Sequence, residues 1–290
     1  MANMCALRSR IKSVESTRQI TKSMKMVAAS KLRRAQTGYN AVRPIAEKCA
    51  QMLQELTKNS QLADNPFLRE RETAGKTCYV ILLGNRGLCG GYNHNLLRYA
   101  QETICGSGEE YTALVCGRWG RDLIAASGIA VEKYFDGIGD TPKAEDVREL
   151  TEYLKNLYLT GGAGKILFLY QNYKTVLLQE PTVLQLFPLE FGGASADESL
   201  REFEFEPDKD TVVERLTRLY IDYFVYSVVL EAKVGEHSSR MAAMTAATDN
   251  TEKLTAKLTQ ELNLARQAAI TTEISEIAGG AAALAENKKG

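Results

Sequence analysis

Apolar residues recur at coiled-coil spacing along the first 58 residues of the chain. Steps of four and three residues alternate along this seam, as expected where two helices pack along their length. Three consecutive seam positions are polar, and Gly38 and Pro44 predict a kink or short break. Residues 1–58 are therefore predicted to form a long coiled-coil helix. Its apolar seam includes Leu7, Ile11, Val14, Ala28, Leu32, Ala35, Tyr39, Val42, Ala46, Cys49, Leu53 and Leu56, and its polar gap is Arg18, Thr21 and Lys25.

The last segment, residues 207–290, repeats the pattern over a greater length. The first part of its seam is Leu216, Tyr220, Tyr223, Ser227, Leu230, Val234, His237, Met241 and Met244. Between Pro207 and Gly279 the only glycine is Gly235, so one uninterrupted helix is expected. About seventy helical residues would span on the order of 100 Å, too long for one small globular domain. Part of this seam consists of threonine and methionine, which suits a shaft that touches a surrounding wall. The two end segments predict an antiparallel pair of helices.

The middle segment, residues 59–206, alternates strand-like and helix-like patterns. Short apolar runs at 78–84, 111–117, 129–135 and 165–171 predict strands, and 175–189 predicts one or two more. Helical patterns at 94–104, 119–127 and 143–160 separate them. Of the 22 glycines in the chain, 17 lie in this segment, as expected of a loop-rich compact domain. The prediction is an α/β domain with a largely parallel sheet, inserted between the two helices.

Charge is unevenly distributed in a chain that is neutral overall. Residues 1–58 carry 12 Lys and Arg against 3 Asp and Glu, which implies an acidic partner: nucleic acid, an anionic membrane or acidic protein loops. Residues 1–38 contain no aromatic side chain for base stacking, which disfavours nucleic acid. The six cysteines form no C-x-x-C motif, so reduced thiols are expected rather than a zinc site. No apolar run approaches the length of a membrane span.

The segment "LLGNRGLCGGYNHN" (82–95) has the glycine content of a phosphate-binding loop. It lacks the lysine and hydroxyl of a P-loop, and its glycines do not follow the dinucleotide spacing. A strand-to-helix turn is therefore favoured over a nucleotide site. Cys89 at a helix start, with His94 nearby in sequence, raises the alternative of a nucleophile. A buried structural thiol is the favoured interpretation, because no carboxylate near His94 would orient it.

Three stretches resemble the gamma subunit of F-type ATP synthases. They are "RIKSVESTRQITKSMKMVAASKLRRAQ" (10–36), "RGLCGGYN" (86–93) and "RMAAMTAATDNTEKLTAKLTQELNLARQAAITTEISEIAGGAAAL" (240–284), and the similarity extends from end to end. The resemblance implies a long antiparallel coiled coil of the terminal helices with an inserted Rossmann-like α/β domain at its foot. It also implies a non-catalytic rotor without a cofactor, present in one copy per complex. Its implied partners are the alpha and beta subunits, the epsilon subunit and the membrane ring.

The resemblance further implies which residues contact the beta subunit. Arg240 and Gln267 correspond to positions that touch beta-subunit loops near the top of the shaft, and Arg266 lies beside Gln267. Lys22, Met24 and Lys25 belong to a stretch that faces acidic beta-subunit loops. The implied location is the cytoplasmic side of a bacterial plasma membrane, as a peripheral subunit, with an organellar inner membrane as the alternative.

Two positions depart from the family pattern. Many members carry an acidic residue where this chain has Asn85, and bacterial relatives often carry glutamate at Lys25. Two other classes of function remain open: a coiled-coil scaffold with an α/β head, which would self-associate, and a nucleotide-dependent enzyme built on the middle domain.

Overall fold

The computed structural model describes residues 2–58, 65–68, 76–190, 205–206 and 208–287. It divides into two compact units. The smaller unit contains residues 1–26 and 243–290, and the larger contains residues 27–242. Helices α1 (Ala2–Lys58) and α5 (Lys209–Asn287) each contribute to both units, which are described separately below.

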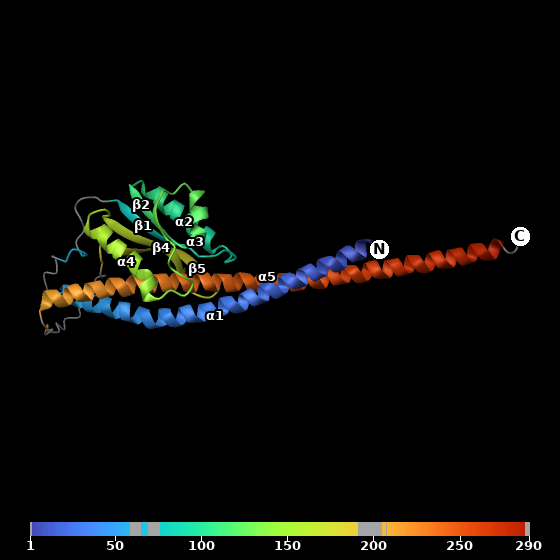
Figure 1. The fold of residues 1–290 in the computed structure, drawn as a ribbon, viewed down its shortest axis with the longest axis horizontal. Coiled ribbons are helices and arrows are strands. Elements are labelled where there is room, and N and C mark those ends of the chain that lie inside the picture. Colours follow the sequence, from blue (N-terminus) through green and yellow to red (C-terminus); the bar gives the residue numbers. More distant parts are fainter. Residues whose placement is uncertain (1, 59–64, 69–75, 191–204, 207, 288–290) are drawn as a thin grey trace. The chain divides into compact units, whose positions relative to one another are not determined.

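The larger unit contains a five-stranded sheet in the order β3-β2-β1-β4-β5 (Figure 1). Strands β1 (Thr77–Leu82), β2 (Tyr111–Cys116), β3 (Val131–Phe135) and β4 (Lys165–Tyr173) run parallel. The last strand, β5 (Gln179–Phe187), pairs antiparallel with β4 at the edge. Helices α2 (Tyr92–Ser107), α3 (Arg118–Ala125) and α4 (Ala144–Leu159) connect the strands. The predicted strand–helix alternation and parallel sheet are confirmed.

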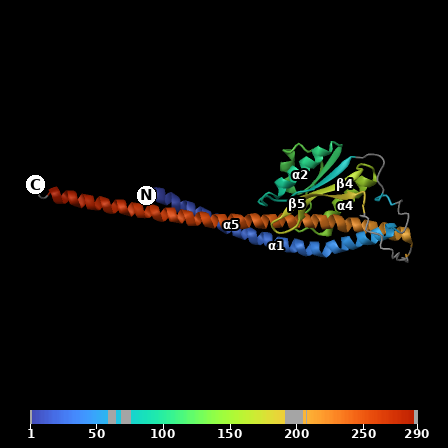
Figure 2. The same ribbon diagram turned by 180° about the vertical axis from the view of Figure 1, so that it is seen from behind.

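Each face of the sheet has its own apolar core. On one face Tyr79, Ile81 and the inward side chains of β2 pack against α2 and α3. On the other face Val80 and Leu114 pack against α4 and the first part of α5 (Figure 2). Because both faces are covered, β1 is buried at all six positions. This explains why its sequence is continuously apolar rather than alternating.

Within the larger unit α1 runs antiparallel to α5. Leu56 near the end of α1 packs with Val213 near the start of α5, and Leu32 packs with Val234 farther along. Of the kink or short break expected at Gly38 and Pro44, the break is absent, because helix α1 continues through both residues. Pro44 cannot donate to the carbonyl of Asn40, but both residues are exposed, so that carbonyl is accessible to solvent.

The smaller unit is built from the other ends of the same two helices. Arg18 forms an ion pair with Glu252 at 3.6 Å, and Thr248 donates to the Thr21 hydroxyl at 3.0 Å. Rising residue numbers on α1 therefore meet falling numbers on α5, so the pair is antiparallel here too. The polar gap of the first seam is filled by this threonine–threonine contact. Among the described residues, no helix has a stretch long and apolar enough to cross a membrane.

Candidate functional site: a buried charge cluster at the glycine-rich turn

The glycine-rich segment is the turn between β1 and α2, as the sequence predicts. The Gly84 amide donates to the side-chain oxygen of Asn93 at 2.8 Å, which ties the end of β1 to the first turn of α2. Gly90 has a φ of 59° and Leu88 a φ of 60°. A positive φ is costly for leucine, whose side chain here is 63% exposed. The backbone of the turn, rather than side-chain packing, therefore determines this conformation.

Cys89 is a buried thiol inside this turn. It is 2% exposed, and its sulfur accepts a hydrogen bond from the Asn93 amide at 3.4 Å. Burial raises the pKa of Cys89, which opposes formation of the nucleophilic thiolate. His94, the expected partner of a nucleophilic cysteine, has an exposed side chain. The interpretation of Cys89 as a structural thiol is supported.

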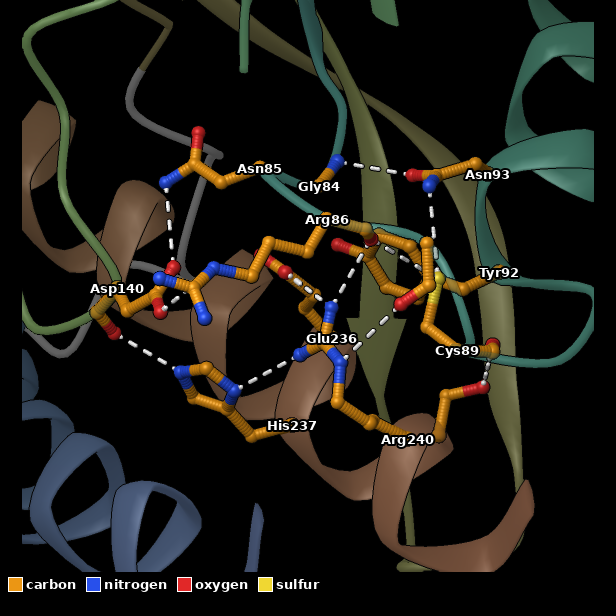
Figure 3. Close-up of polar contacts among 12 residues, drawn as sticks. Gly84, Asn85, Arg86, Cys89, Tyr92, Asn93, Asp140, Glu236, His237 and Arg240 are labelled. Atoms are coloured by element: carbon orange, nitrogen blue, oxygen red, sulfur yellow. Dashed lines mark hydrogen bonds and ion pairs between the residues drawn. The ribbon is translucent and has the colours of Figure 1, made fainter. Parts of the chain in front are cut away.

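A buried carboxylate on α5 lies at the centre of the site (Figure 3). Glu236 is 1% exposed and accepts from Arg240 Nη2 at 2.7 Å and from Lys233 Nζ at 2.9 Å. The side chains of Lys233 and Arg240 are 6% and 10% exposed. Burial alone would raise the pKa of Glu236, but the two cations outweigh it and lower that pKa. Glu236 is therefore a charged group that compensates two buried cations.

Arg240 also joins α5 to the glycine-rich turn. Its guanidinium donates to the carbonyl of Arg86 at 3.0 Å and to that of Gly87 at 3.4 Å. The neighbouring Ser239 hydroxyl donates to the carbonyl of Cys89 at 2.7 Å. These carbonyls lie in a turn outside the regular hydrogen bonding of a helix or sheet. Side chains of α5 therefore supply hydrogen-bond donors for these backbone acceptors.

His237 connects this cluster to the segment before α4. Arginine can only donate, so Nδ1 of His237 is the acceptor in its 3.1 Å contact with Arg240. Nε2 then carries the proton and donates to the carbonyl of Asp140 at 2.9 Å. Burial lowers the pKa of His237, and the hydrogen-bond pattern fits the neutral ring.

Asp140 provides the second carboxylate of the cluster. Its side chain forms ion pairs with Lys31 of α1 and, at 3.8 Å, with Arg86 of the turn. Burial would raise the pKa of Asp140, but the hydrogen bond and charge of Lys31 lower it to about 2. Asp140 therefore links the larger unit's part of α1 to the turn.

Asn85, the position noted above as differing from the resembled family, makes specific structural contacts. Its amide nitrogen donates to the carbonyl of Ile138 at 2.8 Å and lies 3.4 Å from a carboxylate oxygen of Asp140. Its side-chain oxygen is 3.4 Å from the Arg118 amide. Asp140 already supplies a negative charge here, and an amide beside it adds a donor without adding repulsion.

The crevice where α/β sheets commonly bind nucleotides is closed. It lies at the carboxyl ends of β1 and β4, where the chain's strand order reverses. Helix α5 covers it, since a Cβ on Gly235 would lie 3.3 Å from the Gln171 carbonyl oxygen of β4. Beside it, after β1 and β2, a cavity of only about 10 Å³ is lined by Tyr92, Gly117 and Glu236 among others. A cofactor site needs on the order of 300 Å³ or more. Gly117 also lies so close to Leu83 that a Cβ would stand 2.2 Å from its carbonyl oxygen.

The other residues expected at partner contacts lie in the smaller unit, whereas Arg240 lies in the larger one. Lys22, Arg266 and Gln267 are exposed, and Met24 and Lys25 are partly exposed. The Thr21–Thr248 contact fixes the register and places Lys22 level with residue 247, so Gln267 lies about 30 Å farther along the helix, at about 1.5 Å per residue. Within the smaller unit these residues therefore form two separate groups, Lys22, Met24 and Lys25 on α1 and Arg266 and Gln267 on α5.

Sequence analysis missed most of the charge cluster. Glu236 and Arg240 are four residues apart, and Lys233 and Glu236 are three apart, which is the spacing of paired charges on a helix. The signal was that His237 lies on the apolar seam, so charges beside it would be buried. No comparable signal pointed to Asp140. Among the described residues, no group of three or more His, Cys, Asp or Glu side chains is arranged to hold a metal ion.

Comparisons with known proteins identify the family. The model of the ATP synthase family matches residues 3–284. The chain is 39% identical over 284 residues to the ATP synthase gamma chain of Desulfitobacterium hafniense, covering 98% of this chain and 100% of that protein. It is 41% identical over 285 residues to that of Desulforamulus reducens, with the same coverage.

A solved structure has the same fold. The matched chain is from the Euglena gracilis mitochondrial ATP synthase, in a structure of OSCP, F1 and the c-ring. It is 18% identical with a TM-score of 0.66, and the match covers 100% of this chain and 97% of that one. The predicted family is confirmed: the chain belongs to the ATP synthase gamma chains, non-catalytic stalk subunits of the F-type complex.

Proposed function

We propose that this gamma chain is the rotor that the catalytic beta subunits contact through its helix pair. The α/β part of the larger unit is the foot that joins the epsilon subunit and the membrane ring. The closed crevice supports this assignment, because the foot has the topology of a nucleotide-binding domain but α5 occupies the nucleotide position.

The observation that carries the proposal is the exposed apolar end of α5. Ile270, Ile274 and Ile277 are 47%, 62% and 69% exposed, and they lie on one stripe of the helix. By the register of the smaller unit, this stripe lies beyond the level of Ala2, the first described residue of α1. Large exposed apolar side chains in a row are typical of a protein contact. A hydrophobic sleeve formed by the alpha and beta subunits fits them.

The basic character of α1 supports an acidic partner beside the same sleeve. Lys22, Met24 and Lys25 leave at least part of their side chains accessible, so they are available to acidic beta-subunit loops. Exposed charges of this kind set orientation and association rate more than affinity. Lys25 in place of the glutamate common in relatives changes the sign of one such contact.

Arg266, Gln267 and Arg240 are proposed as further contacts of the beta subunit. Arg266 and Gln267 are exposed on α5. Arg240 is bonded to Glu236 and to the turn, so contact with an acidic loop would exchange one carboxylate partner for another. This predicts that Arg240 contributes to a partner contact only when that loop competes with Glu236.

We further propose one gamma chain per complex, held at the cytoplasmic side of a bacterial plasma membrane as a peripheral subunit. The bacterial sources of the most similar relatives support this location. An organellar inner membrane is the alternative.

Reconstitution of the complex tests the proposed contacts. Replacing Arg266 and Gln267 together by alanine is expected to slow ATP-driven ion pumping while one gamma chain is still incorporated per complex. The matched control is Lys257→Ala, an exposed residue on the same helix. Unchanged pumping in the double variant contradicts the contact. Self-association of the purified chain into filaments, without a fixed-composition complex, favours a scaffold instead.

A further inference from the structure

A cavity of about 500 Å³ lies in the larger unit between α1, α5 and the edge of the sheet. It is separate from the charge cluster and is much larger than the closed crevice. Aromatic rings form much of its wall, contributed by all three elements: Tyr39, Tyr170, Tyr173, Tyr220 and Phe224. Its volume lies in the range that holds a small ligand or a partner's side chain.

A carboxylate lies among these rings. Glu231 of α5 lines the cavity and accepts a hydrogen bond from the Tyr170 hydroxyl at 3.2 Å. Burial and the nearby charge of Glu231 raise the pKa of a second tyrosine, Tyr39, to about 12. Among the described residues Glu231 takes part in no ion pair, unlike Glu236 five residues later on the same helix. The donor to Glu231, the Tyr170 hydroxyl, is neutral, so the charge of Glu231 is only partly compensated.

Two cations, Arg43 and Lys174, also line the cavity. Arg43 forms an ion pair with Glu47 at 2.6 Å and donates to the Tyr39 hydroxyl at 2.9 Å. The charge of Arg43 is therefore balanced locally at the rim. Burial raises the pKa of Glu231, and the hydrogen bond from Tyr170 and the charge of Arg43 offset that rise only in part.

We propose that this cavity binds an alkylammonium group, with Glu231 as its counter-ion and the aromatic rings as its walls. Aromatic faces attract cations, and the attraction strengthens in a partly desolvated site. An ionised carboxylate has about four acceptor positions, so Glu231 retains capacity for a further N–H donor beside its bond from Tyr170. An ammonium group can come from a free aliphatic amine or from the lysine side chain of a partner subunit.

Calorimetric titration of the full chain with n-butylammonium tests the proposal, and n-butanol serves as the neutral probe of the same size. Saturable binding of butylammonium, but not of butanol, is expected. Glu231→Gln is expected to weaken binding by at least about tenfold, because it removes the counter-ion and retains the side-chain shape. Glu214→Gln, the same change at an exposed site of α5, is the control and is expected to leave binding unchanged.

The native chain provides an independent measurement should Glu231→Gln fail to fold. Deprotonation of Glu231 creates the counter-ion, so butylammonium affinity is expected to rise with pH through the raised pKa of this carboxyl. A flat pH profile, equal binding of butanol, or no saturation up to about 100 mM overturns the proposal. An unchanged affinity in a folded Glu231→Gln variant also overturns it.

Titration of the assembled complex distinguishes the two sources. If a partner's lysine occupies the cavity, butylammonium binding is lost on assembly. If the ligand is a free amine, binding persists in the complex.

Discussion

Replacement of Glu236 by glutamine is predicted to destabilise the larger unit severely. Glutamine has nearly the same size but removes the one carboxylate that compensates Lys233 and Arg240, whose side chains are 6% and 10% exposed. Breaking a buried ion pair by removing one partner costs about 3–5 kcal/mol, because the remaining charges stay buried without compensation. The predicted loss in free energy of unfolding is therefore about 3–5 kcal/mol.

Helix α5 contains its own control for this experiment. Glu214 forms the same type of pair with Arg218, four residues on, but the two side chains are 64% and 59% exposed. Glu214→Gln is predicted to cost about 0–1 kcal/mol. Unfolding in urea can be followed by the fluorescence of Trp119, the only tryptophan, which lies on α3 against the glycine-rich turn. Equal losses for the two variants would refute the reasoning that burial sets the cost.

A second replacement separates loss of charge balance from loss of packing. Lys233→Met in the Glu236→Gln background removes one of the two uncompensated cations and keeps an apolar stem of similar length. It is predicted to recover part of the lost stability. A further loss of stability in this double variant would show that uncompensated charge is not the cause.

Three further predictions concern the same unit. Asn85→Asp places a second carboxylate beside Asp140 and is predicted to cost about 1–2 kcal/mol in urea unfolding, with recovery on adding Asp140→Asn. The lowered pKa of His237 means that the unfolded chain binds more protons, so stability falls as pH decreases below about 6.5. His237→Gln is predicted to flatten this part of the stability–pH curve. Leu230→Asp is predicted to lower the free energy of unfolding by more than about 3 kcal/mol, because Leu230 is 3% exposed and the new carboxylate would be buried. A variant that unfolds at the wild-type urea midpoint would contradict burial of this position in the seam.

The periodic parts of the fold were predictable from sequence because burial imposes a period on them. The seam residues Leu32, Leu53 and Leu230 are buried as their spacing requires, and the strands coincide with short apolar runs. The short break allowed for at Pro44 does not occur. Proline removes one helical hydrogen bond, and the exposed position of Asn40 leaves the freed carbonyl accessible to solvent.

The charge cluster was less predictable because its members come from separate elements. Glu236 and Arg240 share a helix, so their pairing can be read from spacing. Asp140 and Lys31 are 109 residues apart, and only the fold brings them together. The same holds for Asn85, whose role depends on the position of Asp140. Sequence pattern determines which face of an element is buried, whereas contacts between elements depend on register and loop paths.

The central claim is that this gamma chain turns inside the catalytic hexamer, and single-molecule rotation tests it most directly. Cys105 is exposed on α2 and can carry a probe once the other exposed cysteine, Cys5, is replaced by serine. With the beta subunits fixed to a surface, addition of ATP is predicted to drive unidirectional rotation of the probe. A probe that stays fixed while the same complexes hydrolyse ATP would contradict the account.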